Sequence, residues 1–257
     1  MSERNLLVDV YSEDLGGTPH WPALLDAPDV IGAILKATEG TGFTRPWFAT
    51  NWAAVHDLCP DRYGSTWFRG AYHFLKFNQD GAAQADFYLE VIEAAGGFDV
   101  GDIVPIVDVE LGNDGQPDEN GRSRPRNSNW DASGQQIVDC TSAFAARIRE
   151  QTGQQTMLYG NGAMRDKDIT DRMGCDWLWV PRYTALLPRN IYERAGWSID
   201  TVAMWQYCGD GTGFLADYPT SFDGFGEVDI SVILFDTLED FRAKVTGQVI
   251  ELVPEGG

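Results

Sequence analysis

IVPIVDVE, residues 103–110, is a continuous apolar run that ends in two acids. Runs of this kind are typical of strands that are buried on both faces of a parallel sheet. Asp108 and Glu110 are two residues apart, so on a strand they project from the same face. Carboxylates held within about 7 Å of each other repel, and the repulsion raises at least one pKa. The stretch therefore predicts a strand with a candidate acid–base pair, although a strand end that only reaches solvent could carry the same letters.

Short apolar segments of the same kind recur along the whole chain. With the first stretch they number eight: residues 6–10, 30–37, 70–75, 103–109, 156–159, 177–181, 202–207 and 228–234. Eight such strands suit a closed, mainly parallel barrel. A chain of 257 residues is long enough to form that barrel as one domain.

Helical patterns lie between the earlier strands. Apolar residues follow helical spacing over residues 85–92 and 137–148, and a third helix is expected to begin near Pro46. After Tyr159 the helical signals weaken and the expected strands come closer together. This asymmetry predicts an irregular α/β barrel with fewer helices in its last third.

The segment 112–131, GNDGQPDENGRSRPRNSNWD, is polar and rich in Gly, Pro and Asn. A structureless loop of this length is unusual within a compact domain. Since the pattern on both sides continues one barrel, we interpret the segment as an insertion, with roles as a lid or as a partner-docking site left open. Its acidic half could pair with its basic half, and disorder is the alternative. We expect one catalytic domain over residues 1–245 and a tail over residues 246–257.

Acids also stand at the ends of other expected strands. Asp9 closes the first strand, Glu39 lies just past the second, and Asp229 lies at or near the start of the eighth. In a parallel barrel the carboxyl ends of the strands form the mouth of the active site. Aromatic residues lie in or beside strands three, five, six and seven: Tyr72, Tyr159, Trp179, Tyr183 and Trp205. Acids that converge with aromatic platforms suit a carbohydrate ligand, whose apolar sugar faces stack on rings, although any one of these aromatics could instead be a core residue.

The chain resembles glycoside hydrolase family 25 from about Asp9 to about Leu234. The resemblance rests on an ordered set of motifs: LLVDV, LKATEG, FRGAYHF, PIVDVE, TMLYGN, LWVPRYT, MWQYCGDGTG and EVDISVI. It implies an irregular TIM-like (β/α)5(β)3 barrel and the activity of an N-acetylmuramidase of the phage-endolysin type. Such lysozymes cleave peptidoglycan glycan strands between N-acetylmuramic acid and N-acetylglucosamine, with retention.

The resemblance also implies roles for individual residues. Glu110 matches the general acid and Asp108 the carboxylate that orients the 2-acetamido group of the substrate, which would make the mechanism substrate-assisted. Asp9 and Asp229 match the remaining acids of the catalytic site. Residues expected to bind substrate are Glu39, Tyr72, Tyr159, Tyr183 and Trp205. No cofactor and no metal are implied, since none of the three histidines belongs to a metal-ligand cluster.

The first strand departs from the family pattern. The family commonly has Asp-x-Ser followed closely by His-Trp, whereas this chain has Asp9-Val10-Tyr11-Ser12 and reaches His20-Trp21 several residues later. Neither change removes a carboxylate, but both alter the expected substrate groove. The alternatives are a catalytically silent glycan-binding or structural protein on the same fold, and a hydrolase of another N-acetylated polysaccharide such as chitin. Retention of all four acids weighs against the silent protein.

Charge and composition limit the partners. The chain has 39 acidic and 19 basic residues, a formal charge of −20, which disfavours nucleic acid and anionic membranes. No apolar run approaches a membrane span, and the start lacks the features of a signal peptide. We therefore expect a monomer that is made in the cytoplasm and acts on the bacterial wall after release or delivery. The candidate partners are a phage particle, an injection machine or an immunity protein.

The four scattered cysteines are expected to be reduced core residues.

Overall fold

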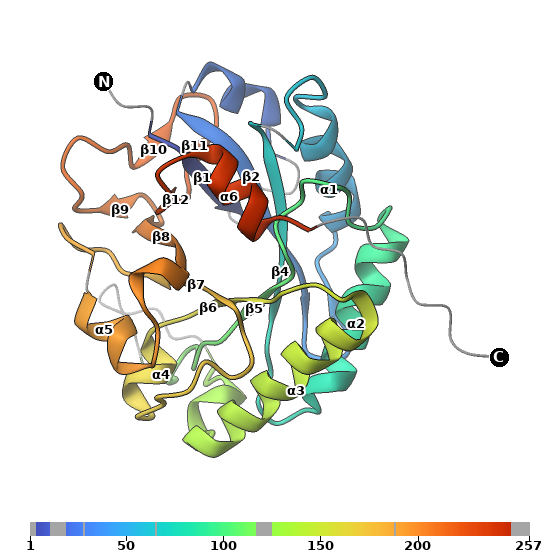
Figure 1. Cartoon of the computed structure of the whole chain (residues 1–257), viewed down its shortest axis with the longest axis vertical. Coiled ribbons are helices and arrows are strands. Elements are labelled where there is room, and N and C mark those ends of the chain that lie inside the picture. The colour runs from blue at the N-terminus through green and yellow to red at the C-terminus, as the bar shows by residue number, and fades with distance from the viewer. Residues whose placement is uncertain are drawn as a thin grey trace.

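The computed structural model describes residues 4–10, 19–27, 29–64, 66–116, 125–187 and 189–247. Eight strands form a closed barrel (Figure 1). They are β1 (Leu6–Val10), β2 (Val30–Glu39), β4 (Phe68–Phe74), β5 (Ile106–Asp108), β6 (Met157–Tyr159), β7 (Trp177–Pro181), β8 (Val202–Gly209) and β12 (Asp229–Ile233). The predicted eight-stranded α/β barrel in one domain is confirmed, and β5 is shorter than its apolar run.

Neighbouring strands are parallel from β1 through β2, β4, β5, β6 and β7 to β8. The strand β12 runs antiparallel to both β8 and β1 and so closes the barrel. Four short strands lie outside it: β3 (Phe43–Thr44), β9 (Thr212–Gly213), β10 (Ser221–Phe222) and β11 (Gly226–Glu227). The reversed direction of β12 brings its first residue, rather than its last, to the mouth of the barrel.

Three long helices cover one half of the barrel (Figure 1). They are α1 (Phe48–Asp57), α2 (Gly81–Ala94) and α3 (Gly134–Thr152), and they coincide with the three predicted helices. Elsewhere the helical segments are short: α4 (Gly162–Asp166), α5 (Arg189–Arg194), η1 (Trp21–Asp26), η2 (Ser128–Asp131) and η3 (Ile199–Thr201). The predicted thinning of helices after Tyr159 is confirmed.

Side chains inside the barrel change from apolar to polar along five of the strands, β1, β2, β5, β6 and β8. The inner core contains Leu7, Ile34, Ile106, Met157 and Met204. Two residues further along the same strands stand Asp9, Lys36, Asp108, Tyr159 and Gln206. Because strand side chains alternate between faces, each polar residue lies on the same inward face as the apolar one before it. The apolar residues thus fill the interior of the barrel, and the polar residues lie above them at its mouth.

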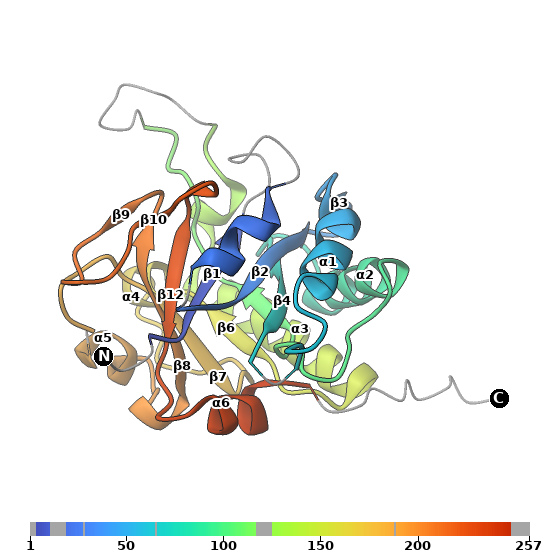
Figure 2. The same ribbon diagram turned by 90° about the horizontal axis from the view of Figure 1, so that it is seen from above.

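A final helix, α6 (Leu238–Val245), closes the other end of the barrel (Figure 2). Its Phe241 belongs to the inner core and packs edge-to-face on Phe68, with ring centroids 5.1 Å apart. This helix was not predicted from the sequence, although Thr237 caps it by accepting from the Asp240 N–H. The residues that follow, Thr246 and Gly247, still pair with residues 103 and 102, and the rest of the expected tail lies outside the described residues.

The four cysteines are buried and free, as predicted for reduced core residues. Within the described ranges, no helix has the length and apolar character that a membrane span requires.

A buried ion pair on the outer face of β4 is expected to matter for stability. Arg69 donates to both carboxylate oxygens of Asp102, at 2.9 and 2.6 Å, and its guanidinium lies 3.6 Å from the ring centroid of Trp52. Replacing Arg69 by Met leaves the Asp102 carboxylate buried without its cation. We expect the free energy of unfolding to fall by about 3–5 kcal/mol, as measured by urea denaturation.

The matched control is Arg194→Met, which removes the exposed ion pair between Arg194 and Asp168. Exposed pairs contribute little, so this variant should lose less than about 1 kcal/mol. Equal losses in the two variants would contradict the importance assigned to the Arg69 pair.

Candidate active site

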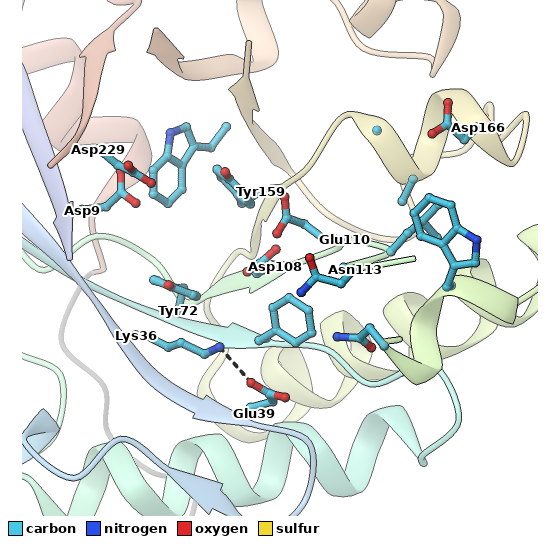
Figure 3. Close-up of a pocket in the computed structure, with 18 of the residues that line it drawn as sticks. Asp9, Lys36, Glu39, Tyr72, Asp108, Glu110, Asn113, Tyr159, Asp166 and Asp229 are labelled. Carbon is cyan, nitrogen blue, oxygen red and sulfur yellow. Dashed lines mark hydrogen bonds and ion pairs between the residues drawn. The ribbon is translucent and has the colours of Figure 1, made fainter. Parts of the chain in front are cut away.

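A cleft of about 890 Å³ opens at the end of the barrel where the parallel strands finish (Figure 3). Its lining includes the four acids predicted as catalytic and three of the residues predicted to bind substrate: Asp9, Asp108, Glu110, Asp229, Glu39, Tyr72 and Tyr159. Figure 3 shows their side chains converging on one space from strands that are far apart in the sequence. The structure therefore brings most of the predicted site together.

Asp229 reaches the cleft because β12 is antiparallel. It is the first residue of β12 and is paired in register with Asp9 on β1. The backbone N–H of Asp210 donates to Asp229 Oδ1 at 2.7 Å, which fixes one side of the carboxylate. The two acids thus lie side by side at the mouth.

Gln206 joins these two acids to two tyrosines. Its Nε2 donates to both oxygens of Asp9, at 3.0 and 3.1 Å, and to Asp229 Oδ2 at 3.3 Å. Its Oε1 accepts from the hydroxyls of Tyr159 and Tyr183, at 2.8 and 3.0 Å. This fully buried residue was not predicted as part of the site, although a glutamine within the buried strand AMWQYC was a signal.

Trp205, predicted to bind substrate, is not brought into the cleft. It precedes the inward-facing Gln206, so strand alternation turns its side chain to the outer face of β8. There the indole is 5% exposed within the outer core and donates to the backbone oxygen of Arg182. Trp179 does line the cleft, and Tyr183 is at hydrogen-bond distance from Gln206.

Three acids of the cleft, Asp9, Asp108 and Glu110, have pKa values above those of exposed acids. Burial raises the pKa of Asp108 well above its usual range, the charge of Glu110 adds to this, and Lys36 opposes it. Burial also raises the pKa of Glu110, again against Lys36. The pKa of Asp9 is raised well above its usual range by burial and then by Asp229. Raised carboxyl pKa values of this origin are typical of general acids.

Glu39 has the opposite electrostatic character. Its Oε2 lies 2.9 Å from Lys36 Nζ and its Oε1 lies 2.7 Å from Lys76 Nζ. Burial alone would raise the pKa of Glu39, but the two lysines more than offset it and the pKa is lowered. Glu39 is therefore an ionised partner of the two lysines and not a proton donor.

One carboxylate oxygen of Asp108 is available to accept a hydrogen bond from a ligand. Among the described residues, its Oδ1 is buried and has no hydrogen-bond partner. A buried acceptor without a partner costs about 1–3 kcal/mol, so native proteins rarely keep one without a reason. A substrate N–H or O–H that donates to this oxygen would remove the cost.

Several residues singled out in the sequence lie outside the described residues or away from the cleft. Tyr11 and Ser12, which depart from the family pattern, lie outside the described residues, as do residues 117–124 of the insertion. Trp21 is a core residue whose indole donates to Asn51 Oδ1 at 3.2 Å. In the described part of the chain, no three His, Cys, Asp or Glu side chains are grouped so that they could hold a metal ion.

The chain is similar to known proteins in sequence. The model of the glycosyl hydrolases family 25 matches residues 8–213. The N,O-diacetylmuramidase of Chalaropsis sp is 33% identical over 130 residues, which make up 50% of this chain and 54% of that protein. The chain thus spans about half the length of this curated relative.

The barrel is similar to solved structures over almost all of its length. A family 25 glycosyl hydrolase from Bacillus anthracis superposes with a TM-score of 0.68 at 19% identity, covering 95% of both chains. The muramidase from Trichobolus zukalii gives a TM-score of 0.68 at 20% identity, covering 93% of this chain and 98% of that one. At these identities the likeness concerns the fold. Because the family model matches well over half of the sequence, the chain belongs to the glycosyl hydrolases of family 25.

Proposed function

We propose that the chain is a peptidoglycan hydrolase that cleaves the β-1,4 bond between N-acetylmuramic acid and N-acetylglucosamine. Membership of family 25 and the muramidase names of a relative and of a structural neighbour support this activity. One observation carries the proposal: Asp108, the last residue of β5, and Glu110, two residues beyond it, have raised pKa values and line the same cleft as Asp9 and Asp229.

Glu110 acts as the general acid. Its proton passes to the glycosidic oxygen as the bond from that oxygen to the anomeric carbon breaks. Glu110 and Asp108 compete for one proton, because each charge disfavours the other. When the acetamido N–H of the substrate donates to Asp108 Oδ1, ionised Asp108 is stabilised and the proton stays on Glu110.

The acetamido oxygen then forms the new bond to the anomeric carbon, and ionised Asp108 stabilises the positive charge that develops on the acetamido group. Water subsequently attacks the anomeric carbon and gives its proton to Glu110, which now acts as a base, while the bond from the acetamido oxygen to that carbon breaks and the acetamido group is restored. Two displacements restore the original configuration, so the reaction proceeds with retention. Asp9 and Asp229, held by Gln206, complete the catalytic site.

Substrate binding is assigned to the residues that reach the cleft. Tyr72 and Tyr159 supply ring surface beside the acids. Tyr183 contributes through its contact with Gln206. Glu39 holds Lys36, the lysine that faces Asp108. Trp205 is excluded from this set because its indole packs in the outer core. No step of this mechanism uses a cofactor or a metal.

Product analysis on purified peptidoglycan tests the proposal. We expect new reducing ends on N-acetylmuramic acid, with the β anomer in excess at early times. Cleavage of chitin without cleavage of peptidoglycan would support a hydrolase of another N-acetylated polysaccharide. Glycan binding without any cleavage would support the silent protein.

The proposed setting is that of a phage-type lytic enzyme, a monomer that acts on the wall after release or delivery. Glycan strands are its partners, whereas the charge of −20 disfavours nucleic acid and anionic membranes. A neighbouring holin gene would support an endolysin, and neighbouring tail or baseplate genes would support an enzyme carried by a phage particle or an injection machine. A gene for an immunity protein would support an injected effector.

Gln206 is expected to position Asp9 and Asp229 for catalysis. The variant Gln206→Met removes its hydrogen bonds to two acids and two tyrosines without emptying the space. Because a hydrogen bond to a charged group contributes about 1.5–3 kcal/mol, we expect kcat/KM on peptidoglycan to fall roughly 10- to 100-fold. The bond from Gln206 lowers the pKa of Asp9, so its loss should also move the pH profile to higher pH.

The control is Gln84→Met, at another fully buried glutamine, which bonds to the backbone of Lys76 outside the cleft. This variant should lose stability without any shift of the pH profile. An unshifted profile in Gln206→Met would leave Gln206 with a structural role only.

A further inference from the structure

The cleft continues past Glu110, away from the paired acids. Figure 3 shows Asp166 on the opposite side of Glu110 from Asp9 and Asp229, and Asn113 beside Glu110 in this view. Inward-facing barrel residues do not build this end. It is lined instead by the two described limbs of the insertion, residues 112–116 and 125–131, and by the short helix α4: Gly112, Asn113, Asn127, Trp130, Gly162 and Asp166.

Asn129 fastens the returning limb of the insertion to the catalytic strand. Its Nδ2 donates to the backbone oxygens of Glu110 and Leu75, at 2.9 and 2.7 Å, and its Oδ1 accepts from the Phe77 N–H at 3.0 Å. The side chain of Asn129 is fully buried, so these bonds are shielded from water. The adjacent Trp130 is therefore held at a fixed place relative to the general acid.

Two further contacts hold the limbs in place. The backbone oxygen of Trp130 accepts from Lys167 Nζ at 3.1 Å, which ties η2 to the end of α4. The N–H of Asn127 donates to the oxygen of Asn113 at 2.8 Å, which ties the two limbs to each other. Gly112 has a φ of +70°, and a Cβ there would lie 2.6 Å from Asn127 Nδ2, so only glycine fits between the limbs. The described limbs of the insertion are therefore held in a fixed position and form one wall of the cleft.

The chemistry of this wall suits an uncharged sugar. The ring of Trp130 is half-buried and offers an apolar face, and the amides of Asn113 and Asn127 can bond to hydroxyl and acetamido groups. Of the described residues that line the cleft, Lys36 alone is cationic, so a peptide carboxylate would find little attraction here. Asp166 is already paired with Arg165 at 2.7 Å.

There is also room for a ligand. A Cβ built on Gly162 meets no atom within 4 Å, so the space in front of this residue is open. The whole cleft, about 890 Å³, is near the upper end of the range of roughly 300–1,000 Å³ that ligand pockets occupy. Such a volume accommodates more than the sugar at which cleavage takes place.

We propose that Trp130, Asn113 and Asn127 form an additional subsite that binds an N-acetylhexosamine unit of the glycan strand, beyond the sugars that flank the cleaved bond. The proposal rests on the hydrolase function proposed above and specifies its substrate as an extended glycan strand. The insertion then serves to lengthen the binding cleft, through the limbs that Asn129 anchors next to Glu110.

Peptide-free glycan oligomers of four and eight sugars, prepared from peptidoglycan, test the subsite. We expect Trp130→Ala to lower kcat/KM on the octamer about tenfold, as for the loss of one aromatic contact, and to leave the tetramer within about twofold of the wild type. Gly162→Leu should have the same effect by filling the space, and its folding is independent of any change at Trp130. The matched control is Trp47→Ala, which removes a half-exposed tryptophan that does not line the cleft.

The outcomes separate the two proposals. If the wild type cleaves neither oligomer, the hydrolase function itself is overturned. If it cleaves both and the two variants match it, the subsite is overturned while the function stands. Equal losses on tetramer and octamer would place Trp130 next to the cleaved bond and overturn the outer subsite, and a loss confined to peptide-bearing strands would overturn the assignment to a sugar.

Discussion

Replacing Glu110 by Gln is expected to lower kcat on peptidoglycan by roughly 10²–10⁴-fold, the usual contribution of a general acid. Gln has nearly the same shape as Glu but has no proton to give to the glycosidic oxygen. The substrate should still bind, because the tyrosines and the other acids of the cleft are unchanged. Initial rates of reducing-end release, with KM measured separately, test this expectation.

The same substitution should stabilise the fold at neutral pH. The pKa of Glu110 is raised above its usual value of 4.5, mainly by burial, so the folded state binds more protons than the unfolded state above that pH. Stability therefore falls as the pH rises from about 4.5 through the raised pKa. Glu110→Gln removes this loss, so its Tm should exceed that of the wild type at pH 7 and approach it near pH 4.

The control for both measurements is Glu93→Gln, at an exposed position on α2. This variant should match the wild type in rate and in Tm at each pH. Undiminished muramidase activity in Glu110→Gln would remove Glu110 from the role of general acid. A Tm difference that does not depend on pH would contradict the raised pKa.

The sequence predicted the barrel and the place of most acids in the cleft because both follow from periodicity. Continuous apolar runs marked the strands, and the two-residue repeat of a strand placed Asp108 and Glu110 on one face. Acids at the ends of parallel strands meet at one mouth whatever the exact twist of the sheet. Asp9 and Glu39 could therefore be assigned to the site without any knowledge of distances.

Other parts of the site depend on contacts that no local pattern records. Trp205 and Gln206 are adjacent in a buried strand, and only the register of β8 against β7 and β12 decides which one faces the cleft. Asn129 looked like one polar residue among many in the insertion. Its role comes from hydrogen bonds to Leu75 and Phe77, more than fifty residues away in the sequence.

The roles of Asp108 and Glu110 can be distinguished by changing the leaving group of the substrate. Asp108→Asn should lower kcat by about 10²–10³-fold, as for the loss of one preorganised electrostatic contact, while binding of glycan oligomers is retained. An aryl glycoside whose phenolate leaves without protonation does not need Glu110, so the loss in Glu110→Gln should shrink on that substrate.

The loss in Asp108→Asn should persist on the aryl glycoside, because the positive charge on the acetamido group forms whichever leaving group departs. Its buried Oδ1, which has no partner among the described residues, is the atom that accounts for this difference. A fluorinated sugar that labelled Asp108 covalently would overturn the assignment, because the carboxylate would then attack the anomeric carbon itself. The same aryl substrate without a 2-acetamido group should not be cleaved by the wild type, since the nucleophile proposed here belongs to the substrate.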